Sequence, residues 1–122
     1  MITGTDFLVM HTNNFDRAVD FYGNTLGLER SMYRPENNFA EFETGNLTIA
    51  VMESKAFGME YRTTTNPLAL RVDDVHAVRA ELESKGVEFA PETIDSGVCH
   101  MAFFRDPDGN ALMLHHRYAP RD

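Results

Sequence analysis

Cysteine is nearly absent from this sequence, since Cys99 is the only one among 122 residues. A single cysteine cannot close a disulfide within the chain, and it excludes a zinc site built from several thiolates. Tryptophan is missing altogether, and Gly and Pro contribute only 8 and 5 residues. Few chain-breaking residues, together with 43% hydrophobic residues, are typical of a folded globular protein. At this length we expect a single domain, residues 1–122, with a substantial core.

Positive charge is also scarce, because 11 Lys and Arg stand against 19 Asp and Glu and give a formal net charge of -8. The sequence has no Lys/Arg cluster that could hold a phosphate backbone, so we expect no nucleic-acid partner and no anionic membrane surface. No apolar run approaches the ~20 residues of a membrane span, and no basic segment followed by an apolar one opens the chain. These absences predict a cytoplasmic protein.

Two segments carry the clearest helix signals. In NNFDRAVDFYGNTLG, residues 13–27, a pair of asparagines can cap the helix, apolar residues follow at helical spacing, and Gly27 can end it. In DDVHAVRAELESKG, residues 73–86, a pair of aspartates and Gly86 have the same positions. Each segment follows an apolar run typical of a strand, and we expect another strand directly after each terminal glycine.

The two halves of the chain repeat one another. An offset of 60 aligns Phe15 with Val75 and Tyr22 with Leu82. A further echo joins GNLTIAV at 45–51 to GNALML at 109–114, where a Gly-Asn turn signal precedes a strand in both cases. The repeat predicts the order β-α-β-β-β twice and an α+β fold class. The expected bounds are module one at about 5–53, a connector at 54–66 and module two at about 67–118.

Four stretches resemble the vicinal oxygen chelate superfamily: FDRAVDFYGNTLGLE, GNLTIAV, PLALRVDDVHAV and FFRDPDGNALML. This superfamily includes glyoxalase I, bleomycin-resistance proteins, extradiol dioxygenases and fosfomycin-resistance enzymes. The resemblance covers nearly the whole chain. It implies the glyoxalase/bleomycin resistance fold, in which two tandem βαβββ modules form a mixed sheet that curls around a cavity, and it implies a homodimer. The Asp-Pro-Asp-Gly stretch at 106–109 has the residue preferences of a type I turn.

The resemblance also implies where relatives would hold a divalent metal ion. The corresponding positions fall at Phe7, at or next to Ala50, at Pro67 and at Met113. Phenylalanine, alanine and proline carry no donor atom, and the methionine thioether suits soft ions. We therefore expect no metal and no cofactor. Phe7, Ala50 and Met113 would instead form an apolar cavity floor.

The sequence thus favours a metal-independent protein that binds a small molecule and sequesters an aromatic or cationic compound, such as an antibiotic. Aromatic side chains would stack on a flat ligand, and Glu41 or Glu43 would meet its positive charge. Arg71 could meet a ligand carboxylate. The predicted ligand-binding residues are Phe7, Val9, His11, Phe39, Glu41, Ala50, Met52, Phe57, Tyr61, Arg71, Met113 and His115.

An enzyme is the alternative that the sequence leaves open. His11 and His115, with a carboxylate from Glu41, Glu43 or Glu53, could form a relocated metal site for a lyase, an isomerase or a dioxygenase-like reaction. One of the histidines could otherwise act as a base without metal, with Arg71 as the electrophilic stabiliser. The catalytic candidates are thus His11, His115 and Arg71.

Overall fold

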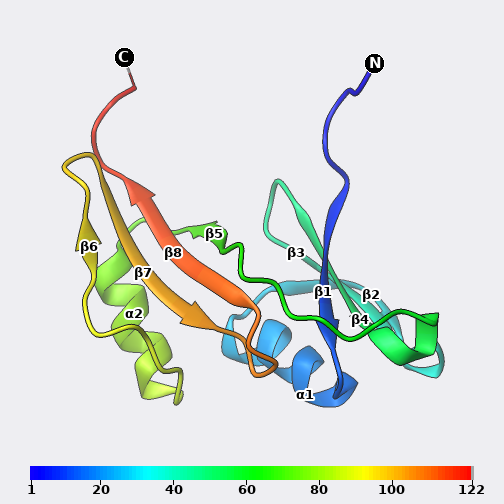
Figure 1. Cartoon of the computed structure of the whole chain (residues 1–122). Helices are drawn as coiled ribbons and strands as arrows, with labels where there is room; N and C mark the ends of the chain where they lie inside the picture. Colours follow the sequence, from blue (N-terminus) through cyan, green and yellow to red (C-terminus); the bar gives the residue numbers. More distant parts are fainter. Residues whose placement is uncertain (122) are drawn as a thin grey trace. The chain divides into compact units, whose positions relative to one another are not determined.

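The computed structural model describes residues 1–121 and divides into two compact units, one up to Thr63 and one from Thr64 onward. Both units have the order strand, helix, strand, strand, strand (Figure 1). The predicted β-α-β-β-β repeat and the α+β class are therefore confirmed. Within residues 1–121, no helix is long and apolar enough to cross a membrane.

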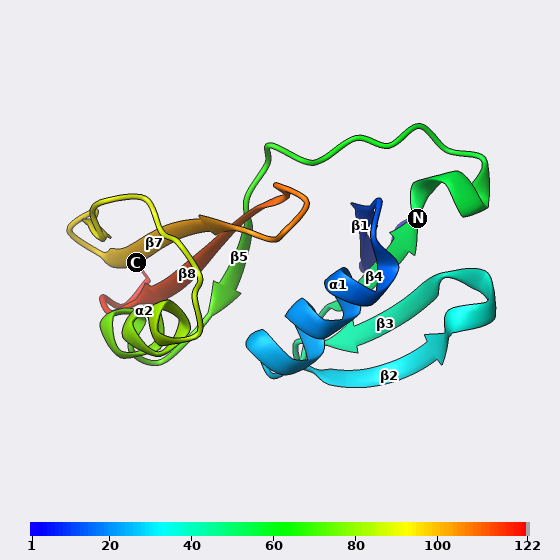
Figure 2. The ribbon, with the colours of Figure 1, turned by 90° about the horizontal axis from the view of Figure 1, so that it is seen from below.

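The first unit is a four-stranded mixed sheet with one helix. The strands lie in the order β1-β4-β3-β2, with β1 parallel to β4 and the other pairs antiparallel. Figure 2 shows α1 lying along its own sheet, and α1 contacts β4. Single 3-10 turns, Pro35–Asn37 and Ser54–Phe57, follow β2 and β4. The elements are β1 (Phe7–Thr12), α1 (Phe15–Asp20), β2 (Glu29–Arg34), β3 (Phe39–Glu43) and β4 (Thr48–Glu53).

The second unit repeats this arrangement in the order β5-β8-β7-β6, with β5 parallel to β8. Its helix packs on β7 and β8. The two helices begin at Phe15 and Val75, which confirms the offset of 60 found in the sequence. The elements are β5 (Leu68–Arg71), α2 (Val75–Ser84), β6 (Ile94–Asp95), β7 (Cys99–Arg105) and β8 (Ala111–Arg117).

Polar side chains cap both helices as the sequence predicts. The Arg17 backbone N–H donates to Asn14 Oδ1 at 3.2 Å, and the Ala77 N–H donates to Asp74 Oδ1 at 3.0 Å. The first helix differs from the prediction in its second half, because a π-helical turn, Phe21–Thr25, continues it after Asp20. This wider turn ends before Gly27, whose φ of +71° is the left-handed conformation that glycine adopts at little cost.

The prediction of a strand directly after Gly86 is wrong. Residue 89 makes only an isolated bridge to β7, and strand pairing starts at β6. Pro91 explains the delay, because proline has no N–H to donate to a neighbouring strand. The Arg79 guanidinium holds the segment instead, since its Nη2 donates to the Ala90 and Pro91 carbonyl oxygens at 2.9 and 3.2 Å and its Nη1 donates to Thr93 Oγ1 at 2.9 Å.

Each sheet uses one face for the core and leaves the other without a helix. Strand side chains alternate, so that Met10, Phe42 and Ile49 are buried on the α1 side of the first sheet, as Leu112 and Leu114 are on the α2 side of the second. We call the opposite faces the helix-free faces. No described helix of the same unit covers these faces, and most of their side chains are half-buried or exposed, although Ala50 and Cys99 are buried. The candidate site is sought there for this reason.

The Asp-Pro-Asp-Gly stretch forms the predicted turn between β7 and β8. The Gly109 N–H donates to the Asp106 carbonyl oxygen at 2.9 Å, and Asp106 Oδ1 accepts from the N–H groups of Asp108 and Asn110 at 3.0 and 2.8 Å. The Asn110 side chain donates to Asp106 Oδ2 at 2.8 Å and accepts from the Thr64 N–H at 2.9 Å. This turn therefore fastens the end of the connector to the second unit.

Candidate ligand-binding site

The helix-free face of the first sheet gathers most of the predicted ligand-binding residues. Val9 on β1, Ala50 on β4 and Glu41 on β3 are successive neighbours across the sheet. The next row consists of His11, Met52 and Phe39. Phe7 lies at the other end of β1 on the same face and is 56% exposed. Seven residues that are far apart in the sequence thus share one surface: Phe7, Val9, His11, Phe39, Glu41, Ala50 and Met52.

Glu41 and Glu43 differ in their environments on this face. Ser31 Oγ and Thr48 Oγ1 donate to the Glu43 carboxylate, and these two hydrogen bonds, Ser31 first, lower the pKa of Glu43. Within residues 1–121, no hydrogen bond or ion pair reaches the half-buried Glu41 carboxylate. Its neighbours across the sheet are Ala50 and Met32, which supply no donor side chain. Of the two carboxylates, Glu41 is therefore the one that could pair with a bound cation.

A pocket of about 490 Å³ opens beside Phe39, at the end of the same face. The Phe39 and Phe57 rings lie 6.0 Å apart between centroids and are tilted by 60°. Phe57, in the 3-10 turn after β4, is 43% exposed. A volume of this size is within the usual range for small-molecule sites. The remaining lining residues are Met32, Arg34, Glu36, Asn37, Asn38 and Ala56.

Tyr61 lies at a different hollow, one of about 200 Å³ that Thr12, Asn13, Glu53, Ser54 and Lys55 also line. His11 Nδ1 is 2.9 Å from Ser54 Oγ, so this ring nitrogen is already engaged in a hydrogen bond. Glu53 pairs with Thr12 and thus points to the side of the sheet away from His11. The prediction that Glu53 could join His11 in a metal site is wrong for this reason.

Arg71, Met113 and His115 share the helix-free face of the second sheet. Arg71 and His115 are direct neighbours on β5 and β8, and Met113 is the neighbour of Ala69. His116 points to the α2 side, where it lies opposite His100. The structure thus sorts the predicted residues into a group on the first sheet and a group on the second.

The positions that the resemblance implies for a metal do not fit a hard divalent ion. Phe7, Ala50, Pro67 and Met113 offer no oxygen or nitrogen side-chain donor. Among the described residues 1–121, no three His, Cys, Asp or Glu side chains lie together in a way that could hold a metal ion.

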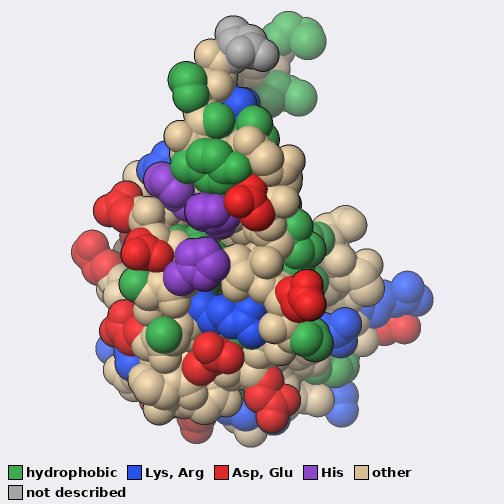
Figure 3. Space-filling view, turned by 90° about the vertical axis from the view of Figure 1, so that its left-hand side faces the viewer, with side chains coloured by type: hydrophobic (Ala, Val, Ile, Leu, Met, Phe, Trp, Pro, Cys, Tyr) green, Lys and Arg blue, Asp and Glu red, His purple; other side chains and the backbone are tan. Residues whose placement is uncertain are grey.

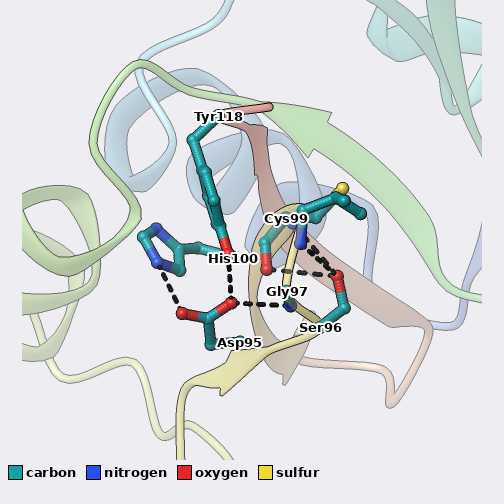
Figure 4. A network of polar contacts seen from close by, with 7 residues as sticks. Asp95, Ser96, Gly97, Cys99, His100 and Tyr118 are labelled. Carbon is teal, nitrogen blue, oxygen red and sulfur yellow. Dashed lines mark hydrogen bonds and ion pairs between the residues drawn. The ribbon is translucent and has the colours of Figure 1, made fainter. Parts of the chain in front are cut away.

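A polar network that was not predicted from the sequence links Tyr118, which follows β8, to the second sheet (Figure 4). Tyr118 OH donates to Asp95 Oδ1 at 2.7 Å, and the Gly97 N–H donates to the same oxygen at 2.9 Å. His100 Nε2 lies 3.4 Å from Asp95 Oδ2, and its ring is 5.3 Å from that of His76. Histidine side chains gather on this face of the unit beside acidic and basic ones (Figure 3). Sequence periodicity could not reveal the network, because its members come from separate elements.

This network predicts how two groups titrate. The Gly97 N–H, followed by the Tyr118 hydroxyl, lowers the pKa of Asp95, whereas donation to Asp95 raises the pKa of Tyr118. Because the folded pKa of Tyr118 is raised, its contribution to stability is present below the unfolded value of about 10 and is lost as pH rises through the folded value.

In the native protein, we expect Tyr118 to ionise at a higher pH than free tyrosine. Its contribution is the component of the tyrosinate absorbance that is missing from Tyr118→Phe. In Asp95→Asn this same component should move back toward pH 10, the ordinary value for tyrosine. An unchanged component in Asp95→Asn would contradict the network as described.

The fold and the two helix-free faces define the class of tandem βαβββ proteins. The chain belongs to the Glyoxalase/Bleomycin resistance protein/Dioxygenase superfamily, whose family profile matches residues 4–114. It is 29% identical to the Bacillus subtilis (strain 168) protein YraH, described as uncharacterized, over 84% of this chain and 90% of that one.

Solved structures with the same fold include proteins described in different terms. TnmS3, an antibiotic binding protein from Streptomyces sp. CB03234, has a TM-score of 0.79 at 22% identity, with coverage of 95% of this chain and 97% of that one. Lactoylglutathione lyase from Agrobacterium tumefaciens has a TM-score of 0.74 at 15% identity, with coverage of 93% of both chains. At these identities the likeness shows the fold alone, so the function has to be argued from this chain's residues.

Proposed function

We propose that this protein is a metal-independent binding protein that holds an aromatic, cationic small molecule on the helix-free face of its first sheet. The observation that carries the proposal is the Glu41 carboxylate, which has no partner among residues 1–121 and is flanked by Ala50 and Met32. A carboxylate in apolar surroundings attracts a cation more strongly than one in water, because fewer water molecules screen the charge.

The aromatic part of such a ligand has a suitable place next to Glu41. Phe39 is two residues from Glu41 on the same strand face, and its ring forms the pocket wall with Phe57. Offset or edge-to-face contacts with two rings favour a flat ligand ring. The net charge of -8 adds a general attraction for cations. Tight binding alone would lower the free concentration of an antibiotic, with no turnover needed.

The experiment is calorimetric titration of the whole chain with 9-aminoacridine, a planar aromatic cation. With ~15 heavy atoms and about 0.35 kcal/mol per atom, the expected dissociation constant is on the order of 100 μM. Glu41→Gln keeps the size of the side chain and removes its charge, so we expect affinity to fall about tenfold. Glu92→Gln, which removes an exposed carboxylate in the second unit, should leave the affinity unchanged.

Two results would count against this function. Equal loss of affinity in Glu41→Gln and Glu92→Gln would mean that only net charge matters. Anthracene-9-carboxamide has a similar flat ring system and no charge. If it bound as tightly as 9-aminoacridine, the positive charge of the ligand would not contribute to binding.

Metal independence is tested separately by elemental analysis after incubation with Ni²⁺, Zn²⁺, Mn²⁺ and Fe²⁺ and desalting. We expect no stoichiometric retention, because the positions implied for metal ligands carry no hard donors. One metal ion retained per chain, and lost in His115→Ala, would overturn this expectation and favour the lyase, isomerase or dioxygenase-like alternative. We also propose a homodimer, which sedimentation analysis of the purified protein would test.

A further inference from the structure

The helix-free face of the second sheet is basic, although the protein as a whole is acidic. Strand alternation and register place Arg71, Arg105, His115 and Arg117 on this face. No Asp or Glu of β5, β6, β7 or β8 shares it, since Asp95 pairs with His100 on the α2 side. The other strand residues of the face are Ala69, Ile94, Cys99, Met101, Phe103, Ala111 and Met113.

Arg71, at the end of the edge strand β5, and His115, on the adjacent strand β8, are polar groups of this face that remain accessible. They are direct neighbours on parallel strands, which brings their backbones within about 5 Å of each other. Arg71 is exposed and His115 is half-buried. Neither side chain has a hydrogen bond or ion pair within residues 1–121. The Arg71 guanidinium and the His115 imidazole could thus both contact one bound anion.

Arg117 adds a fixed positive charge two residues beyond His115 on the same strand face. Its Nη2 donates to the Pro120 carbonyl oxygen at 3.3 Å, and its Nη1 lies 4.0 Å from Cys99 Sγ. Its Nε is buried and has no hydrogen-bond partner in the described part of the chain. Because no carboxylate of residues 1–121 pairs with this guanidinium, its positive charge favours an anion at the surface beside it.

Apolar side chains surround the basic groups. Phe103 is the neighbour of Met113, and Met101 is the neighbour of His115, and all three apolar side chains are half-buried. Such a surface suits an anion with an apolar body better than a fully hydrated inorganic ion, because the ring of the ligand would displace water from Phe103 and Met113. The planar guanidinium of Arg71 matches a carboxylate in shape and can donate two parallel hydrogen bonds.

We propose that this face binds the carboxylate of an aromatic small molecule, with Arg71 and His115 contacting the carboxylate and Phe103 and Met113 contacting the ring. The inference goes beyond the proposed function, which concerns a cation on the first sheet.

The test is an NMR titration of ¹⁵N-labelled full-length protein with benzoate. We expect the amide signals of β5 and β8 to shift, with a dissociation constant in the millimolar range that follows from ~9 heavy atoms. Arg71→Gln should weaken benzoate about tenfold, and His115→Gln by a smaller factor. Arg62→Gln is the matched control, because Arg62 is an exposed arginine of the first unit that pairs with Glu60.

Two further ligands separate the contribution of the ring from that of the negative charge. Acetate, which lacks the ring, and inorganic phosphate should both bind more weakly than benzoate. Phosphate binding as tight as benzoate, or equal affinities in Arg71→Gln and Arg62→Gln, would overturn the proposal. Glu41→Gln should retain the benzoate affinity of the native protein, so that failure of the cation site and failure of this site give different results.

Discussion

Phe42→Ala should destabilise the first unit by about 3–5 kcal/mol, the usual cost of emptying a phenylalanine site in a core. The Phe42 side chain is fully buried between its sheet and the first helix, with its ring centroid 6.0 Å from that of the buried Tyr22. The π-helical turn after α1 approaches the Phe42 ring closely: a Cβ added to Gly23 would lie 3.2 Å from that ring. Phe42→Ala would therefore leave a cavity between the sheet and this helix.

Urea unfolding followed by circular dichroism measures this loss, and amide hydrogen exchange locates it in the first unit. Phe39→Ala is the matched control from the same strand. Phe39 lies on the opposite face, where it is half-buried beside Phe57. We expect a smaller loss of stability for Phe39→Ala and a weaker affinity for 9-aminoacridine. A greater destabilisation by Phe39→Ala than by Phe42→Ala would mean that the two faces of this sheet have been assigned the wrong way round.

Asn110→Ala should cost about 2–4 kcal/mol in the second unit. Asn110 is 1% exposed, and its side chain donates to Asp106 and accepts from the Thr64 N–H. Removal of the amide leaves a buried carboxylate oxygen short of a donor and a backbone N–H without its acceptor. Each such group costs about 1–3 kcal/mol when its partner is deleted, with more for a charged group.

The internal repeat supplies the control for this substitution. Asn46 occupies the corresponding Gly-Asn position before β4, but it is exposed. In the described part of the chain its side chain makes one hydrogen bond, accepted from Thr44 Oγ1 at 3.3 Å. We therefore expect Asn46→Ala to change the free energy of unfolding by no more than about 0.5 kcal/mol. Equal effects of the two substitutions, measured by urea unfolding, would contradict the role given to Asn110.

The repeat in the sequence predicted the architecture because local patterns encode it. Caps at Asn14 and Asp74, glycines after both helices and alternating strands act over a few residues each. The main failure, the strand after Gly86, arose where Pro91 interrupts pairing and an arginine on the neighbouring helix holds the chain by its carbonyl oxygens. That contact joins segments eleven and twelve residues apart and has no periodic signature.

By itself the sequence determined the family, the two βαβββ modules and the lack of donors at the positions implied for a metal. Tertiary structure alone decided which carboxylate has a partner, since Glu43 accepts from Ser31 and Thr48 whereas nothing within residues 1–121 donates to Glu41. It also decided that Glu53 points away from His11, and that Asp95 meets Tyr118. Composition and spacing fix which groups a chain carries, but hydrogen bonds and burial depend on register and on contacts between distant segments, which exist only once the chain has folded.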